Sequence, residues 1–257
     1  MPSFTNADGL AIAYDDTGPA GARPLLMIHG FSSNRGEGWK RTGWFAACQQ
    51  RGQRALALDL RGHGESAKPH DPSLYGRQKL AGDVIALMDH LEIDTADVIG
   101  FSLGSRVAAT VAMNAPRRVS NLILSGVGDR WFKPSQDDDA MARAMEAGDP
   151  ASISQPLLQS FRHFADEQGE DRLALAACTR AEKDPITADH LYGIMAPTLV
   201  IAGARDDLAG DPRGLAEAIP GAKAVSVPGC DHFALITHGL LKASAFDFLD
   251  GWLEEMP

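Results

Sequence analysis

The chain has 257 residues, of which 44% are hydrophobic and 23% are charged, and its formal net charge is −10 at pH 7. This length and composition predict one large α/β domain, or a core with one insertion, and exclude a disordered chain. The acidic balance and the lack of any basic block argue against a nucleic-acid partner, because phosphate binding depends on clustered lysine and arginine.

The first residues of the chain and its cysteines predict the cellular compartment in which the protein is found. The first ten residues, MPSFTNADGL, contain neither a basic stretch nor an apolar segment, which predicts no signal peptide and no membrane span. Cys48, Cys178 and Cys230 are widely spaced, which favours free thiols in a reducing compartment over disulfides and does not match a zinc site. We therefore expect a cytoplasmic protein without a metal, and nothing in the sequence specifies its oligomeric state.

Strand-like and helix-like segments alternate along the chain. Residues 4–14, around Asp8 and Gly9, predict a hairpin at the edge of a sheet. Six apolar runs that end in glycine or polar residues then predict the strands of a buried parallel sheet, at residues 25–28, 55–60, 98–99, 122–124, 198–202 and 224–227. Helix-forming segments lie between them, at residues 39–51, 75–91, 103–114, 212–218 and 240–253. This alternation predicts a doubly wound α/β fold with right-handed crossovers.

The interval 129–194 interrupts the alternation. It contains no clear strand, but helical patches lie around residues 140–147, 153–164 and 172–181. A structureless loop of roughly 65 residues is improbable inside a compact domain. We therefore expect a helical cap at residues 129–194, inserted into a core formed by residues 1–128 and 195–257.

One serine lies between two glycines where a predicted strand changes into a predicted helix. Residues 98–108, VIGFSLGSRVA, contain the pattern G-x-S-x-G from Gly100 to Gly104. In a nucleophile elbow, this pattern forms a sharp turn that exposes the serine hydroxyl above the sheet. The alternative is a glycine-rich turn in which Ser102 only caps the helix.

A serine hydroxyl becomes a nucleophile when a base accepts its proton and a third group orients the base. Two later strands are followed by suitable side chains, Asp206 after LVIAG and His232 after AVSVPG. The carboxyl ends of strands are where open α/β sheets place their sites. The spacing from Gly203 favours Asp206 over its neighbour Asp207, and Asp129, which follows an earlier strand, is a further candidate for the acid.

Four parts of the chain resemble the α/β-hydrolase superfamily: LLMIHGF, LDLRGHGES, VIGFSLGS, and the pair LVIAGARDD with VPGCDHF. The resemblance implies an α/β-hydrolase fold without a cofactor, with Ser102 as nucleophile, His232 as general base and acid, and Asp206 as the orienting carboxylate. It also implies an oxyanion hole formed by the backbone N–H groups of Phe31 and Leu103. We expect a serine hydrolase that cleaves small or medium-sized carboxylic esters through an acyl-enzyme intermediate.

Several other activities use the same triad. Lactonases, thioesterases, C–C bond hydrolases, acyltransferases and cofactor-free haloperoxidases or perhydrolases remain open, because a fold does not determine a reaction. A non-catalytic ligand receptor on the same fold is the alternative outside the enzymes. The resemblance argues against the haloalkane dehalogenase and epoxide hydrolase branches, which carry an aspartate where this chain has Ser102.

The expected substrate pocket is mainly aromatic and apolar, as is typical of small-molecule sites. Its expected lining residues are Phe31 and Leu103, whose backbones flank the nucleophile, together with Trp131, Phe161 and Phe233. For Trp131 and Phe161 the alternative is ordinary packing within the cap. We expect structural roles near the site, chiefly hydrogen bonds that hold loops, for His29, His63, Asp59 and Arg61.

Overall fold

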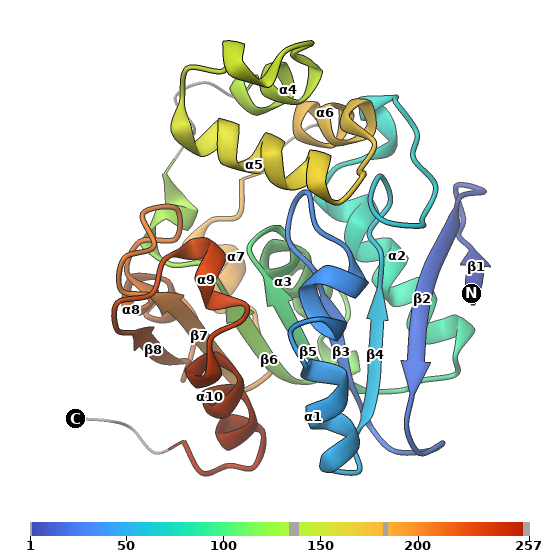
Figure 1. Ribbon diagram of the computed structural model, residues 1–257. Coiled ribbons are helices and arrows are strands. Elements are labelled where there is room, and N and C mark those ends of the chain that lie inside the picture. Colours follow the sequence, from blue (N-terminus) through green and yellow to red (C-terminus); the bar gives the residue numbers. More distant parts are fainter. Residues whose placement is uncertain (1, 134–138, 182–184, 254–257) are drawn as a thin grey trace.

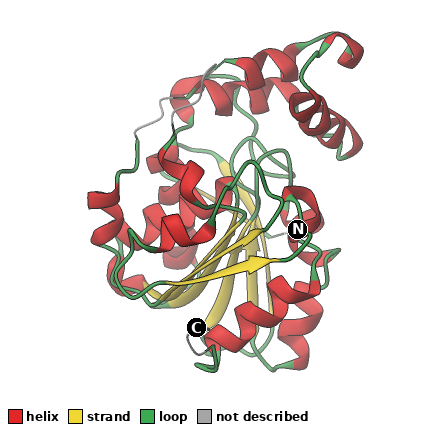
Figure 2. Cartoon of the chain, turned by 90° about the vertical axis from the view of Figure 1, so that its left-hand side faces the viewer, coloured by secondary structure: helices red, strands yellow, loops and turns green. Residues whose placement is uncertain are grey.

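The computed structural model describes residues 2–133, 139–181 and 185–253. Within these residues an eight-stranded sheet runs through the centre of the molecule, in the order β1-β2-β4-β3-β5-β6-β7-β8 (Figures 1 and 2). The first two strands of this order pair antiparallel with their neighbours, and the others pair parallel. The strands are β1 (Ser3–Thr5), β2 (Ala11–Thr17), β3 (Pro24–Ile28), β4 (Arg54–Leu58), β5 (Ala96–Phe101), β6 (Val119–Ser125), β7 (Thr198–Gly203) and β8 (Lys223–Val227).

Helices cover both faces of the sheet, because successive side chains of a strand point to opposite faces. In β3, Leu26 and Ile28 belong to one apolar cluster, and Leu25 and Met27 belong to the other. The helices on the first face are α2 (Arg77–His90), α3 (Leu103–Asn114) and α8 (Pro212–Ala216), and those on the second are α1 (Trp44–Gln50) and α10 (Gly239–Leu249). The expected doubly wound α/β-hydrolase fold is confirmed.

Two predicted helices differ from the observed ones. The helix expected at 39–51 is divided into a π-helical turn, η1 (Gly36–Lys40), and α1, because Gly43 between them has a φ of +81°. This left-handed backbone is open to glycine and interrupts a right-handed helix. The helix expected to reach residue 253 ends at Leu249, and Gly251 beyond it has a φ of +77°.

A separate group of helices lies above the carboxyl ends of the parallel strands (Figure 1). It consists of α4 (Ala140–Glu146), α5 (Pro156–Glu167) and α6 (Arg172–Arg180), and we call it the α4–α6 layer. Met145, Phe161 and Leu175 belong to its own apolar cluster. By contrast, Trp131 and Leu191, near the ends of the interval 129–194, pack in the cluster of α2 and α3. The division into a core and a cap at these boundaries stays a prediction.

Short elements complete the described chain. Two helices that were not predicted, α7 (Ala188–Tyr192) and α9 (His232–Leu235), are too short to show a helical period in the sequence. The single turns of 3-10 helix are η2 (Pro72–Leu74), η3 (Pro116–Arg118), η4 (Asp129–Phe132) and η5 (Pro150–Ser152). None of the helices in the described part of the chain has the length and apolar character that crossing a lipid bilayer requires.

Candidate active site

Ser102 lies at the turn between β5 and α3, with a φ of +53° and a ψ of −111°. A serine rarely adopts such a backbone conformation, and strain of this kind concentrates at functional sites. The two glycines of the pattern permit the turn, because a Cβ on Gly100 would overlap the carbonyl oxygen of Gly104, and one on Gly104 would overlap that of Ile28. The side chain of Ser102 makes no capping hydrogen bond to α3, which argues against the capping interpretation.

The structure brings Ser102, His232 and Asp206 together. The Nε2 atom of His232 lies 3.1 Å from Oγ of Ser102, and its Nδ1 atom lies 2.8 Å from Oδ2 of Asp206. His232 is only 6% exposed and Asp206 only 4% exposed, so water has little access to the pair. An Nδ1–H that donates to the carboxylate leaves Nε2 unprotonated and able to accept the serine proton.

The backbone around Asp206 holds its carboxylate in one orientation. Its Oδ1 atom accepts hydrogen bonds from the N–H groups of Leu208 at 3.1 Å and Ala209 at 2.9 Å, which leaves Oδ2 for the imidazole. Asp207 is exposed, and the Oδ1 atom of Asp129 accepts from the N–H of Asp211 at 3.0 Å. Among the described residues, therefore, the carboxylate that contacts the imidazole of His232 belongs to Asp206 and not to either alternative.

Two aromatic rings flank the imidazole of His232. The ring of Phe101 lies 5.1 Å from it, and Phe233 makes an edge contact at 5.8 Å. His232 is the first residue of α9, and the carboxylate of the preceding Asp231 accepts from the N–H of Ala234 at 2.9 Å. This cap and the two rings restrict the imidazole to the side of the cavity that faces Ser102.

Two backbone N–H groups near Ser102 are available to a ligand. Leu103 is the first residue of α3, so its N–H has no partner within the helix and lies at the positive end of the helix dipole. Phe31 follows Gly30, and a Cβ on Gly30 would lie 3.5 Å from that of Ser102, which shows how closely this loop approaches the elbow. In the described part of the chain, neither N–H donates a hydrogen bond.

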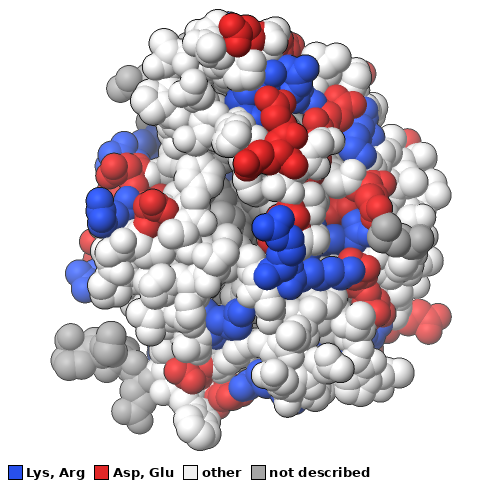
Figure 3. All heavy atoms as spheres, in the orientation of Figure 1, with Lys and Arg blue, Asp and Glu red and all other residues white. Residues whose placement is uncertain are grey.

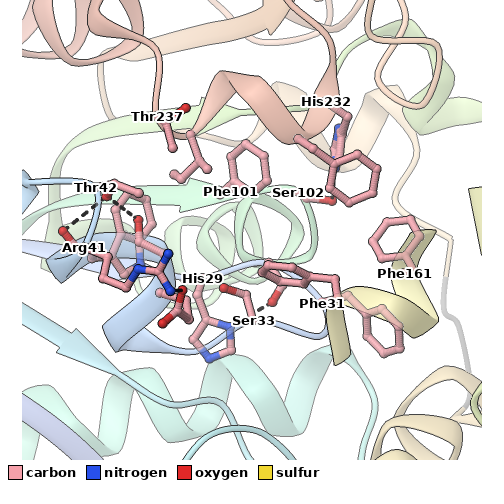
Figure 4. Close-up of a pocket in the computed structure, with 17 residues that line it drawn as sticks. His29, Phe31, Ser33, Arg41, Thr42, Phe101, Ser102, Phe161, His232 and Thr237 are labelled. Atoms are coloured by element: carbon pink, nitrogen blue, oxygen red, sulfur yellow. Dashed lines mark hydrogen bonds and ion pairs between the residues drawn. The ribbon is translucent and has the colours of Figure 1, made fainter. Parts of the chain in front are cut away.

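A cavity of about 280 Å³ opens beside Ser102 (Figure 4). Phe161 of α5 lies at one end, Arg41 and Thr42 lie at the other, and Ser102 with His232 borders the space between them. The lining residues are His29, Gly30, Phe31, Ser33, Glu37, Gly38, Trp39, Arg41, Thr42, Phe101, Ser102, Phe161, Phe164, His232, Phe233, Ile236 and Thr237. On the face shown in Figure 3, the surface is hollowed below the α4–α6 layer, and acidic and basic side chains are interspersed around it.

Three of the five expected pocket residues line this cavity, namely Phe31, Phe161 and Phe233. The other two do not, and this corrects the prediction. Trp131 is 5% exposed in the core cluster, where the guanidinium of Arg106 lies 4.4 Å from its ring centroid. Leu103 offers its backbone to the elbow, but its side chain packs against the same core cluster.

Sequence reasoning missed the polar end of the cavity. Glu37, Arg41 and Thr42 come from η1 and the residues that follow it, and Arg41 forms an ion pair with Glu37 at 2.6 Å. Thr237 reaches the same cavity from the end of α9. No local pattern marks these residues, because an interrupted helix and the end of a four-residue helix have no recognisable period.

The two histidines expected to be structural hold loops beside the site. Nε2 of His29 accepts from the N–H of Leu60 at 3.0 Å, so its Nδ1 donates to the carbonyl of Gly30 at 2.8 Å. His63 lies 3.1 Å from the carbonyl of Arg61 through Nδ1, and its ring meets the ring of Phe31 edge-on at 5.9 Å. Burial lowers the pKa of His29 to about 4 and that of His63 to about 3, so both rings are neutral at pH 7.

The remaining polar residues of the LDLRGHGES stretch shape its loop. Asp59 is fully buried and accepts from the backbone N–H groups of Arg35 at 2.7 Å and Glu65 at 2.8 Å. The guanidinium of Arg61 donates two hydrogen bonds, both at 2.7 Å, to the carboxylate of Asp83 on α2 and another to the carbonyl of Leu74. These contacts hold the loop against the first face of the sheet.

Comparison with known proteins gives the family. Residues 23–152 match the alpha/beta hydrolase fold family. An acetyltransferase relative, the dihydrolipoyllysine-residue acetyltransferase component of the acetoin cleaving system of Pseudomonas putida, is 29% identical over 251 residues. The match covers 90% of this chain but 64% of that relative, so the chain spans less than two thirds of its length.

Other relatives match over most of their own length. The 3-oxoadipate enol-lactonase 2 of Acinetobacter baylyi is 27% identical over 80% of this chain and 82% of the relative. A solved hydrolase from Pseudomonas aeruginosa PA01 superposes with a TM-score of 0.81 at 27% identity, covering 97% of this chain and 98% of that one. Further relatives include a non-heme chloroperoxidase and an epoxide hydrolase, so proteins similar to this chain differ in their reactions. The match over half of its length and the agreement of its fold show that the chain belongs to the alpha/beta hydrolase family.

Proposed function

We propose that the protein is a serine hydrolase that cleaves carboxylic esters of small or medium size through an acyl-enzyme intermediate. The observation that carries the proposal is the line of contacts from Ser102 through His232 to Asp206, which borders an aromatic cavity. A binding protein has no need for a strained serine, an oriented imidazole and a buried carboxylate in this sequence of contacts. The same geometry therefore weighs against the receptor alternative.

The proposed mechanism assigns one step to each group. Oγ of Ser102 attacks the ester carbonyl carbon while Nε2 of His232 accepts the hydroxyl proton, and the carboxylate of Asp206 stabilises the imidazolium that forms. The N–H groups of Phe31 and Leu103 receive the negative charge that develops on the carbonyl oxygen. His232 then gives its proton to the leaving alcohol oxygen, and a water molecule, activated by the same imidazole, hydrolyses the acyl-enzyme.

The cavity favours a compact substrate with an apolar part. Its volume of about 280 Å³ lies just below the range for small-molecule sites, which is roughly 300–1,000 Å³. The rings of Phe31, Phe161 and Phe233 suit an apolar acyl or alcohol group. Hydrolysis of a small lactone is the second candidate, because a lactone is a cyclic ester that needs the same groups and the enol-lactonase relative matches over most of both chains.

The test uses p-nitrophenyl esters of increasing acyl length and a panel of lactones, with the purified protein and its Ser102→Ala variant. We expect release of p-nitrophenol by the wild type, with a preference for short and medium acyl chains, and a loss of turnover of roughly 10⁴-fold or more in the variant. A fluorophosphonate probe should label the wild type on Ser102. Ser33→Ala removes another hydroxyl from the same cavity and should retain labelling and turnover.

Two results would contradict the proposal. Equal turnover by the wild type and by Ser102→Ala would show that another group is the nucleophile. Tight binding of esters or lactones by the wild type, without turnover and without labelling, would identify a receptor.

A further inference from the structure

A buried carboxylate of the α4–α6 layer reaches into the core beside the cavity. Glu170 lies in the loop between α5 and α6 and is 7% exposed. Its Oε1 atom accepts a hydrogen bond from Nδ2 of Asn34 at 3.0 Å, and its Oε2 atom accepts one from the N–H of Gly64 at 2.8 Å. Asn34 follows β3 and Gly64 follows β4, so a single side chain connects the layer to two loops of the core.

The backbone of Glu170 is fixed to the end of α5. Gly169 has a φ of +66°, its N–H donates to the carbonyl of Asp166 at 3.2 Å, and the N–H of Glu170 donates to that of Ala165 at 3.0 Å. This pair of hydrogen bonds is a Schellman motif, which ends a helix in a defined geometry. Because α5 also carries Phe161, the position of the Glu170 carboxylate is coupled to the aromatic wall of the cavity.

Asn34 connects Glu170 to the opposite wall. The Oδ1 atom of Asn34 accepts from the N–H of Glu37 at 2.9 Å, and its carbonyl accepts from the N–H of Gly38 at 2.8 Å. Glu37, Gly38 and Trp39 belong to η1, and all three line the cavity. The amide of Asn34 thus binds η1 through its oxygen and Glu170 through its nitrogen.

Gly64 connects Glu170 to the loop that supports Phe31. With a φ of +52°, Gly64 lies so close to Asp59 that a Cβ on it would overlap that carboxyl group, so the position of its N–H is fixed. The preceding residue is His63, whose ring contacts Phe31. Phe31 in turn packs against the apolar cluster of the α4–α6 layer.

We propose that Glu170 is a positioning residue, which sets the separation between the aromatic wall on α5 and the wall formed by η1 and thereby the space in which the substrate binds. The catalytic part of this inference rests on the proposed function. Burial raises the pKa of Glu170, while the hydrogen bonds from Asn34 and Gly64 oppose the increase. The N–H groups of Asn34 and Gly64 therefore stabilise the ionised carboxylate of Glu170 at this buried position, and the carboxylate in turn satisfies both donors.

The first test replaces the carboxylate by an amide of the same shape, in Glu170→Gln. Both partners are donors, so a glutamine can accept from one of them only and must direct its NH₂ group at the other. Asn34 cannot compensate by rotating its amide, because its oxygen already accepts from Glu37. We expect KM for short p-nitrophenyl esters to rise at least about tenfold, as for the loss of a hydrogen bond to a charged group, with kcat changing by less than about threefold.

The chain offers a matched control and a rescue. Glu167→Gln makes the same change on α5, at an exposed side chain that pairs with His163 at 3.2 Å, and should leave KM unchanged. In the double variant Asn34→Asp with Glu170→Gln, donor and acceptor are exchanged, so the glutamine donates to the new carboxylate and still accepts from Gly64. We expect this exchange to restore KM to within about threefold of the wild type.

Hydrogen exchange of the Gly64 amide measures the contact without activity. We expect faster exchange in Glu170→Gln and wild-type exchange in both Glu167→Gln and the double variant. Wild-type KM and wild-type exchange in Glu170→Gln would overturn the inference, as would a double variant as impaired as the single one. If Glu170→Gln does not fold, Asn34→Asp is compared with the double variant instead. A lower KM and slower Gly64 exchange in the double variant than in Asn34→Asp would support the inference, and equal impairment of the two would overturn it. Absence of esterase activity in the wild type would contradict the proposed function, whereas the exchange data would still test Glu170.

Discussion

Gly104 of α3 packs so closely against the end of β3 that an alanine there should disrupt both stability and activity. A Cβ on Gly104 would lie 2.6 Å from the carbonyl oxygen of His29 and 2.7 Å from the carbonyl carbon of Ile28, and closer still to the oxygen of Ile28. These neighbours are backbone atoms of β3 and its end, so no side chain can rotate away. Since C···O contacts lie at about 3.3 Å or more, α3 must move by roughly 1 Å.

The size of the effect follows from this displacement. Forcing an extra methyl group into a packed interior typically costs 1–3 kcal/mol. Because the contacts at Gly104 are with rigid backbone, we expect Gly104→Ala to lie at the upper end and to lower the free energy of unfolding by about 3 kcal/mol. Because Ser102 and Leu103 directly precede Gly104, the same shift should displace Ser102 and the N–H of Leu103 from their present positions relative to His232. A misplacement of about 1 Å at a reacting group lowers turnover by roughly 10²-fold.

The assay compares urea denaturation and ester turnover of the wild type, Gly104→Ala and a control, Gly82→Ala. Gly82 lies in α2, is exposed, and has open space where a Cβ would be. Alanine is the better helix former, so the control should be more stable by up to about 1 kcal/mol, with unchanged activity. A Gly104→Ala variant with the denaturation midpoint and turnover of the wild type would refute the reasoning.

Two further predictions concern stability. Ser105 is fully buried, and its Oγ atom accepts a hydrogen bond from the N–H of Ser125 at 2.9 Å and donates one to the carbonyl of Gly100 at 2.8 Å, so Ser105→Ala removes both contacts between α3 and the sheet and should lower the free energy of unfolding by about 1–3 kcal/mol; an unchanged urea midpoint would contradict this. Because the pKa of His29 is about 4 in the folded protein and 6.5 when unfolded, the unfolded state binds more protons as the pH falls from about 6.5 to about 4. The free energy of unfolding should therefore decrease over this range, by about 3 kcal/mol for His29 alone, and His63 acts in the same direction. Urea titrations at pH 7.5 and 4.5 check the sign, and the decrease should be smaller in His63→Gln.

Local sequence determined the sheet, the helices of its two faces and the elbow. The segments 25–28 of β3 and 122–124 of β6 are apolar runs that are followed by polar residues, and such runs can be recognised without knowledge of their neighbours. The elbow could be predicted for a related reason, since Gly100 and Gly104 are required by contacts within a few residues of Ser102 and with the adjacent strand. Helix boundaries were less accurate where a single glycine, such as Gly43, changes the direction of the chain.

Only the tertiary structure decided which distant side chains meet. The sequence left Asp206, Asp207 and Asp129 open as the acid, and the backbone after β7 turns the carboxylate of Asp206 alone among them toward His232. Likewise, Trp131 was as plausible a pocket residue as Phe161 until packing placed its ring under Arg106. The side chains at the polar end of the cavity and the Glu170 contacts depend on segments more than 100 residues apart, and a local pattern carries no information about such distances.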